Sequence, residues 1–279
     1  MSFLSSKSIL YSLLFVLFIW LIPQISAAQK EQSPYRLSYQ ADIPIVFTSL
    51  AFELGGISLT QKIMPLTEMD IADLDPMDIN PFDRGVTGFF NESIADVSDW
   101  FLNTAPLYPV IFVLADNKMR KDFLVLGALT AETLFMTEAL VRFSKGAFKR
   151  TRPLVYNPDV PYSPFKDGKG AKVSFFSGHT AMVSSMSFFS ARLFADYHPD
   201  SKWRYVVWGL AAAVPATVAG MRVAAGKHFY TDVIAGYLIG GAVGYFIPTI
   251  HKKVAQKHRK KANVKLDTGL GLTRLSWEF

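Results

Sequence analysis

Three polar clusters lie among strongly apolar segments in the second half of the chain, and their residue types suit chemistry on phosphate. The clusters are Lys145 with Arg152, then Ser177-Gly178-His179, then Arg222 with His228 and Asp232. Together they supply cations for phosphate oxygens, an imidazole nucleophile, a second imidazole as proton donor and a carboxylate that orients a histidine. The inventory predicts a phosphoryl-transfer site.

Spacing within the clusters indicates how predicted helices position them. His228 and Asp232 are four residues apart at the start of a predicted helix, which places both on one face. His179 follows a Ser-Gly turn and opens another predicted helix, where backbone N–H groups bind anions. Gly178 lets the backbone approach a phosphate closely because it has no side chain.

In order, the clusters resemble the signature of the type 2 phosphatidic acid phosphatase superfamily, which also includes bacterial acid phosphatases and vanadium haloperoxidases. That signature reads K-x6-R-P, P-S-G-H and S-R-x5-H-x3-D, and all its gaps occur between Lys145 and Asp232. Phe176 replaces the proline of the second motif, and Met221 replaces the serine of the third. Neither replacement removes a charged or titrating group.

The resemblance implies a role for each matching residue. It implies that His228 attacks phosphorus and forms a phosphohistidine, that Asp232 accepts a hydrogen bond from the other ring nitrogen of His228, and that His179 protonates the leaving oxygen before activating water. The implied phosphate-binding groups are Lys145, Arg152, Ser177, Gly178 and Arg222. Side chains supply the positive charge, so no metal and no cofactor are expected.

The apolar content is high for a soluble protein and modest for a protein that lies mostly in a membrane. The chain has 279 residues, of which 50% are apolar, and it contains no cysteine, which excludes disulfides and cysteine-ligated metals. Its formal charge of +6 is concentrated after Ile250, which indicates a membrane-side feature and no nucleic-acid partner. The recurring aspartates between Asp70 and Asp83 lack the glycine and final glutamate of an EF-hand loop.

The order of segments predicts four regions. Residues 1–28 are expected to be a signal peptide, because Lys7 precedes an apolar run that ends in Ser26-Ala27-Ala28. An uncleaved anchor helix is the alternative. Residues 29–96 are expected to form a periplasmic or interfacial segment, residues 97–250 the catalytic helical domain, and residues 251–279 a basic tail. The last stretch, 266–279, alternates weakly as a strand does, and its role is not assigned.

Five apolar segments of near-spanning length predict the fold: 97–115, 123–141, 178–197, 203–221 and 229–250. The expected fold class is all-α, an antiparallel helical bundle in the membrane with about five to six spanning helices after the signal. Gly236, Gly240 and Gly244 recur every four residues and predict close helix packing. Residues 43–59 are short and contain Pro44 and Glu53, so we expect them to lie along the surface or to re-enter.

Charged loops predict the orientation. The basic loop 116–121 and the basic tail are expected in the cytoplasm. Loops 142–177 and 222–228 then lie together on the outer side, which predicts an inner-membrane protein with a periplasmic site. Other basic side chains near the clusters are interpreted as topology anchors: Lys149, Arg150, Lys166, Lys169 and Lys172. We interpret His198, His251 and His258 as structural, and Glu132 and Glu138 as members of a polar seam in an apolar helix.

Three functions remain compatible with these residues. The first is a phosphatase acting on a membrane lipid: phosphatidic acid, phosphatidylglycerol phosphate, a polyprenyl diphosphate or lipid A. The second is a soluble periplasmic acid phosphatase acting on small esters, and the third is a vanadium haloperoxidase. The loop 154–176, rich in Pro and Gly, is expected to cover the site and select the head group.

Overall fold

A computed structural model describes residues 33–161, 166–262, 265–269 and 272–276, so the predicted signal peptide lies outside the described residues. The helices are α2 (Tyr39–Gln61), α3 (Glu68–Ala72), α4 (Pro81–Arg84), α5 (Glu92–Thr104), α6 (Leu107–Ala115), α7 (Asn117–Arg120), α8 (Phe123–Phe148), α9 (Gly178–Tyr197), α10 (Trp203–Ala224) and α11 (Tyr230–Ala262). Short 3-10 turns are η1 (Pro76–Asp78), η2 (Gly85–Gly88), η3 (Pro153–Tyr156) and η4 (Lys169–Lys172).

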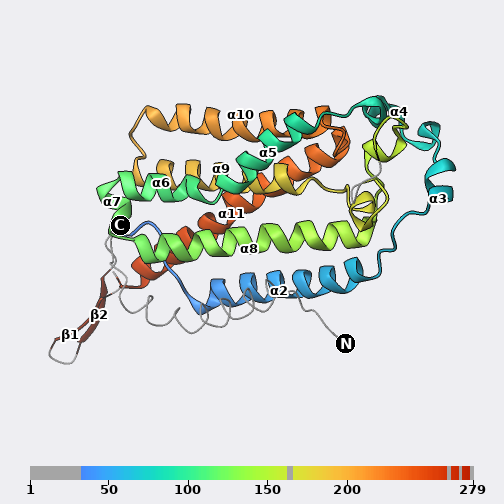
Figure 1. Ribbon diagram of the computed structural model, residues 1–279. Helices are drawn as coiled ribbons and strands as arrows, with labels where there is room; N and C mark the ends of the chain where they lie inside the picture. Colours follow the sequence, from blue (N-terminus) through green and yellow to red (C-terminus); the bar gives the residue numbers. More distant parts are fainter. Residues whose placement is uncertain (1–32, 162–165, 263–264, 270–271, 277–279) are drawn as a thin grey trace.

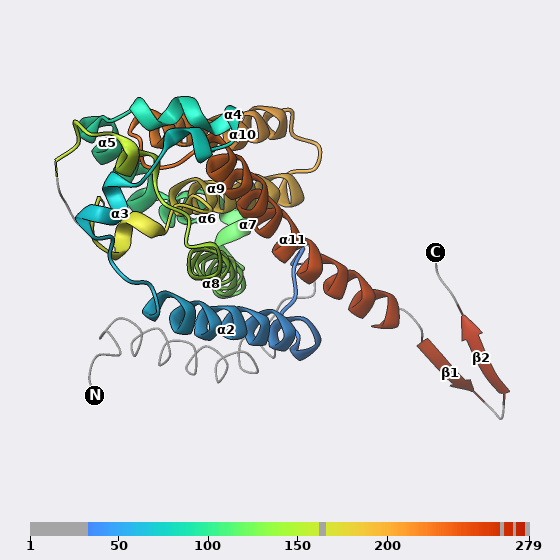
Figure 2. The ribbon, with the colours of Figure 1, turned by 90° about the vertical axis from the view of Figure 1, so that its right-hand side faces the viewer.

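The bundle is built around α9, which packs against α8, α10 and α11, while α2 lies along the outer side of α8 (Figures 1 and 2). Among the described residues, four helices are long and apolar enough to cross a membrane: α2, α8, α10 and α11. The pair α5 and α6 is bent by 47° and would make a fifth span. These observations confirm the predicted helical membrane fold. The central helix α9, which we also expected to span, is not among these candidates.

The expectation for residues 43–59 is not supported. They belong to α2, a helix of 23 residues that is longer than the apolar run suggested and meets the criteria for a membrane span. Pro44 lies inside α2, one turn past its start, and the helix continues through it although proline cannot donate a backbone hydrogen bond. Glu53 pairs with Arg142 of α8 at 2.8 Å, so its charge is balanced.

The two ends of the bundle differ in charge. At one end, the basic end, lie α7, the start of α2 and the end of α11 (Figure 1). The connections that carry the three polar clusters lie at the opposite end, the site end (Figure 1).

Beyond α11, strands β1 (Lys265–Gly269) and β2 (Leu272–Ser276) pair as an antiparallel hairpin. The strand-like alternation of the tail therefore reflects a local hairpin, which the all-α expectation did not include.

The predicted glycine spacing on α11 produces close packing against α9. A Cβ atom on Gly240 would lie 2.1 Å from the carbonyl oxygen of Ala181, and one on Gly244 would lie 2.1 Å from that of Ser185. Gly236 faces the carbonyl oxygen of Ser177 in the same way, at 2.6 Å. These glycines thus fix the distance between the two helices that carry the second and third clusters.

Substituting Gly240 by alanine is expected to destabilise the fold by about 1–3 kcal/mol, because the new methyl group overlaps rigid backbone. The measurement is the apparent Tm of the detergent-solubilised protein. Gly127→Ala is the matched control, since Gly127 is exposed in α8 and a Cβ atom added there would have no described neighbour within 4 Å. Alanine should be neutral or mildly stabilising there, because it is the better helix former. Equal effects of both substitutions would contradict the packing role of Gly240.

Candidate active site

The three clusters meet at the site end, where helix ends and the connections between them carry their residues. Lys145 lies in the last turn of α8, and Arg152 lies just beyond it. Ser177 caps α9, so Gly178 and His179 are its first two residues. Arg222 is in the last turn of α10, His228 is in the connection that follows, and Asp232 is in the first turn of α11. The expected co-location of the loops is confirmed, whereas the chemical roles of these residues stay predictions.

His228 is buried, and one of its nitrogens faces a cation. Its Nε2 lies 3.3 Å from a guanidinium nitrogen of Arg152. Burial, followed by the positive charges of Arg152, Arg222 and Lys145, holds the pKa of His228 well below its ordinary value. The ring is therefore neutral at physiological pH, which is the form that has a nucleophilic lone pair.

Asp232 lies beside His228 as the four-residue spacing predicted, but the expected hydrogen bond is not formed. His228 Nδ1 is 3.7 Å from Asp232 Oδ2, and Nδ1 has no hydrogen-bond partner among the described residues. Asp232 Oδ2 accepts instead from the Ser174 hydroxyl at 2.5 Å and from the Phe229 backbone N–H at 2.9 Å. The carboxylate is thus fixed in place close to the ring of His228.

The three predicted phosphate-binding cations are held by different contacts. Arg152 is buried and donates to the carbonyl oxygens of Gly170 and Lys227, at 2.8 and 2.7 Å. Arg222 donates to the Ser98 hydroxyl at 2.9 Å. The Lys145 ammonium lies next to the start of α9, where a Cβ atom on Gly178 would be 3.3 Å from it. Gly178 therefore leaves room for the lysine and for a close approach of phosphate.

The turn before His179 is held by packing and hydrogen bonds, and it lacks the proline of the signature. The backbone N–H of Phe176 donates to the Ser144 hydroxyl of α8 at 3.0 Å, and the Phe176 ring packs against Val141 and Ala181. Ser177 donates its N–H to the carbonyl oxygen of Asp232 at 3.0 Å, which joins the second cluster to the third. The aromatic residue thus anchors the turn by packing, where proline would restrict the backbone.

Asp99 of α5 is a site residue that sequence reasoning missed. Its Oδ1 is 2.6 Å from His179 Nε2 and 3.1 Å from Arg222, while 53% of its side chain is exposed. A carboxylate oxygen thus bridges the predicted proton donor and one predicted phosphate-binding arginine. The available signal was an acidic residue at the start of the first apolar segment, at the end that faces the clusters.

Arg150 was interpreted as a topology anchor, and that interpretation is wrong. Its guanidinium bridges Asp232 at 2.6 Å and Asp83 at 2.8 Å, and it lies over the Phe229 ring. Asp83 is fully buried and also accepts from the Thr231 hydroxyl and backbone N–H. The acidic segment that precedes α5 is therefore fastened to the start of α11 through Arg150.

Lys166 is a second basic residue whose interpretation as an anchor is wrong. Its side chain is buried, and its ammonium donates to the carbonyl oxygens of Asn157, at 2.8 Å, and Val160. It therefore ties residue 166 to residues 157–160 of the connection between η3 and η4.

The turn before His228 needs glycine at position 226. Gly226 has a φ of 67°, and a Cβ there would lie 2.0 Å from the Phe89 carbonyl oxygen.

Replacing Arg150 by methionine is expected to lower stability by about 3 kcal/mol, because two buried carboxylates lose their shared cation. This is the lower end of the range for a broken buried pair, since the Arg150 side chain is 24% exposed. Thermal unfolding in detergent measures the effect. The control is Lys149→Met at the neighbouring exposed position, which should change stability by less than about 0.5 kcal/mol. A stable Arg150→Met variant would show that Arg150 is dispensable to the network.

Parts of the chain are similar to known proteins. Residues 125–256 match the model of the PAP2 superfamily, which confirms the resemblance seen in the motifs. A lipid A 4'-phosphatase of Porphyromonas gingivalis is 30% identical over 143 residues, which are 50% of this chain and 57% of that protein. The chain thus aligns with somewhat more than half the length of this relative.

One solved structure is also similar. It is a transmembrane PAP2-type phosphatidylglycerolphosphate phosphatase from Bacillus subtilis, with a TM-score of 0.45 and 18% sequence identity. The alignment covers 86% of this chain and 96% of that one.

Proposed function

We propose that this chain, whose residues 125–256 match the PAP2 superfamily, is a metal-independent phosphatase that removes a phosphate group from a membrane lipid. The observation that carries the proposal is the neutral, buried His228 with its Nε2 facing Arg152, among two further cations. The long helices of the bundle expose apolar side chains, including Phe47 and Leu54 of α2 and Leu210 of α10. Such surfaces suit lipid contact.

The proposed reaction has two steps. His228 Nε2 attacks phosphorus, the P–O bond to the lipid breaks, and His179 gives a proton to the departing lipid oxygen. Burial and the positive charges of Arg222, Lys145 and Arg152 lower the pKa of His179 to about 2, so its protonation requires the negative charge that the substrate phosphate brings beside Asp99. Water, activated by the now neutral His179, then attacks the phosphohistidine, so that the P–N bond breaks and inorganic phosphate leaves. Arg152, Arg222 and Lys145 balance the charge that spreads over the phosphoryl oxygens in both transition states.

The substrate class we propose first is a phosphorylated lipid A. The support is the similarity to a lipid A 4'-phosphatase. The other candidates are phosphatidic acid, phosphatidylglycerol phosphate and polyprenyl diphosphate, because the three cations recognise only the phosphate.

Phosphate release from these four lipids and from p-nitrophenyl phosphate, in mixed micelles with chelator present, tests the proposal. We expect kcat/KM for one lipid to exceed that for p-nitrophenyl phosphate at least tenfold, which corresponds to about 1.4 kcal/mol of binding to the lipid portion. His228→Ala provides the blank. Equal values for lipids and the small ester would favour the acid-phosphatase alternative, and halide oxidation with added vanadate would favour the haloperoxidase.

We also infer that the protein lies in a bacterial inner membrane with its site facing the periplasm. The basic end carries Lys118, Arg120 and Lys121 and the start of the basic tail, and such charge is enriched on the cytoplasmic side. This orientation has α2 crossing from the cytoplasmic to the periplasmic side, in place of the surface position expected from its sequence. Cleavage after residue 28 would leave the start of α2, at Tyr39, in the periplasm, so this orientation disagrees with the expected cleaved signal peptide.

Single-cysteine labelling is expected to report this topology, and the chain has no native cysteine to interfere. Asp167→Cys at the site end should react with a membrane-impermeant thiol reagent once the outer membrane is permeable. Lys257→Cys in α11 and Gln40→Cys at the start of α2 should react only after the inner membrane is broken. The reverse pattern would place the site in the cytoplasm. If Gln40→Cys reacted before the inner membrane is broken, as Asp167→Cys should, while Lys257→Cys stayed protected, α2 would not cross the membrane.

A further inference from the structure

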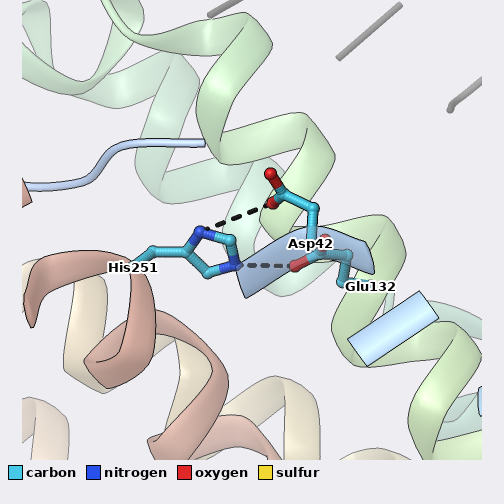
Figure 3. A group of neighbouring side chains, drawn as sticks. All are labelled: Asp42, Glu132 and His251. Atoms are coloured by element: carbon cyan, nitrogen blue, oxygen red, sulfur yellow. Dashed lines mark hydrogen bonds and ion pairs between the residues drawn. The ribbon is translucent and has the colours of Figure 1, made fainter. Parts of the chain in front are cut away.

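A second cluster of titrating side chains lies inside the bundle near the basic end. It joins Asp42 of α2, Glu132 of α8 and His251 of α11, and all three side chains are buried (Figure 3). His251 Nε2 is 2.8 Å from Glu132, and His251 Nδ1 is 3.7 Å from Asp42. One potential ligand atom of each residue lies within 4.8 Å of those of the other two. We call this cluster the buried triad.

Two oxygens of the buried triad have no hydrogen-bond partner among the described residues. They are Asp42 Oδ1 and Glu132 Oε1. Within the described residues, no Lys or Arg side chain forms a hydrogen bond or an ion pair with any of these three side chains. Two carboxylates thus face one imidazole in an apolar interior, where uncompensated charge and unpaired oxygens are costly.

From this geometry we infer that the buried triad is a binding site for one divalent transition-metal ion, of which Zn²⁺ and Mn²⁺ fit the ligands best. Imidazole binds Zn²⁺ well, carboxylates bind Mn²⁺ well, and both ions accept mixed nitrogen and oxygen ligands. A dication would balance both carboxylates beside a neutral imidazole. It would also give Asp42 Oδ1 and Glu132 Oε1 a partner.

The surroundings of His251 and Asp42 suit this role. His251 Nδ1 lies 3.1 Å from the Arg36 carbonyl oxygen and donates to it, which leaves the Nε2 lone pair directed toward Glu132. A backbone carbonyl that accepts from the second nitrogen of a histidine is a common support for metal ligands. Asp42 Oδ2 accepts from the Ser38 backbone N–H at 2.5 Å, so its other oxygen remains available.

This site is separate from the phosphatase site. Glu132 and Lys145 lie 13 positions apart on α8, and Asp232 and His251 lie 19 positions apart on α11. At about 1.5 Å per residue these separations are roughly 20 and 28 Å, so the ion would not contact the phosphate. Its effect would be to hold the start of α2 against α8 and α11, and the inference does not depend on the proposed function.

The test is metal binding by the purified full-length protein in detergent. After chelator treatment and equilibrium dialysis against Zn²⁺ or Mn²⁺, elemental analysis should find about one ion per chain, and the ion should raise the apparent Tm. Glu132→Gln should weaken binding at least tenfold and abolish the Tm increase. Glu138→Gln is the matched control on the same helix, because Glu138 is half-exposed and pairs with Arg142, so it should bind as the unmodified protein does.

A measurement on the unmodified protein keeps the inference testable if Glu132→Gln does not fold. Pulsed EPR of the Mn²⁺-loaded protein should detect one directly bound imidazole nitrogen, from His251. Retention of less than about a tenth of an ion per chain, absence of the nitrogen coupling, or unchanged binding by Glu132→Gln would each overturn the metal site. The buried triad would then be a histidinium held between carboxylates that share a proton.

Discussion

His228→Ala is expected to lower the rate of phosphate release by about 10⁴-fold or more, the loss that follows removal of a catalytic nucleophile. The reason lies in the position of the ring, which is buried with Nε2 at 3.3 Å from Arg152. No other described side chain offers a neutral nitrogen at that place. Initial rates on the best lipid substrate measure the effect, with gel filtration and apparent Tm to show that the variant folds.

His258→Ala is the matched control for this experiment. His258 is exposed near the end of α11, at the opposite end of the bundle, so its loss should leave the rate unchanged. In addition, the unmodified enzyme quenched during turnover should carry a phosphoryl group that resists alkali and is released by acid, as a P–N bond does. Rates for His228→Ala close to those of the unmodified enzyme would exclude His228 as the nucleophile.

His179→Ala is expected to have the second largest effect, and its size should depend on the leaving group. General acid catalysis typically contributes about 10²–10⁴-fold, and it matters most when the departing oxygen is a poor leaving group. A lipid or sugar alkoxide needs the proton, whereas p-nitrophenolate leaves without it. We therefore expect a loss of about 10³-fold on lipid substrates and at most about tenfold on p-nitrophenyl phosphate.

The comparison with Asp99 sharpens this prediction. Asp99 contacts both His179 and Arg222, so Asp99→Asn should weaken protonation of His179 and should lower the rate on lipid substrates more than the rate on p-nitrophenyl phosphate. If His179→Ala reduced both substrates equally, His179 would be a structural or phosphate-binding residue and not the proton donor. Rescue of the lipid rate by added imidazole would support the acid role.

The helical fold and the co-location of the clusters followed from the sequence because both depend on local patterns. Apolar length marks the helices, and fixed gaps between Arg222, His228 and Asp232 mark one turn and one helix face. The spacing of Gly236, Gly240 and Gly244 also predicted close helix packing, and their contacts with α9 confirm it.

What the sequence did not indicate depends on contacts between distant segments. Arg150 and Asp83 are 67 positions apart, and nothing in either neighbourhood shows that they pair. The same holds for Asp99 with His179, which are 80 positions apart. His251 looked like a structural histidine and Glu132 like part of a polar seam, because their proximity arises only when α8 and α11 pack. The length of α2 was underestimated because its polar first and last turns hide the helix in a hydropathy profile.

Two attachments of α8 constrain how this protein can change over evolutionary time. Lys145, in the last turn, meets the start of α9, and Glu132, in the interior of the helix, meets His251. A single inserted residue between them would rotate one attachment by about 100° relative to the other, because a helix has 3.6 residues per turn. Homologues that keep both contacts should therefore vary freely in the loops but keep the number of residues from Glu132 to Lys145 constant.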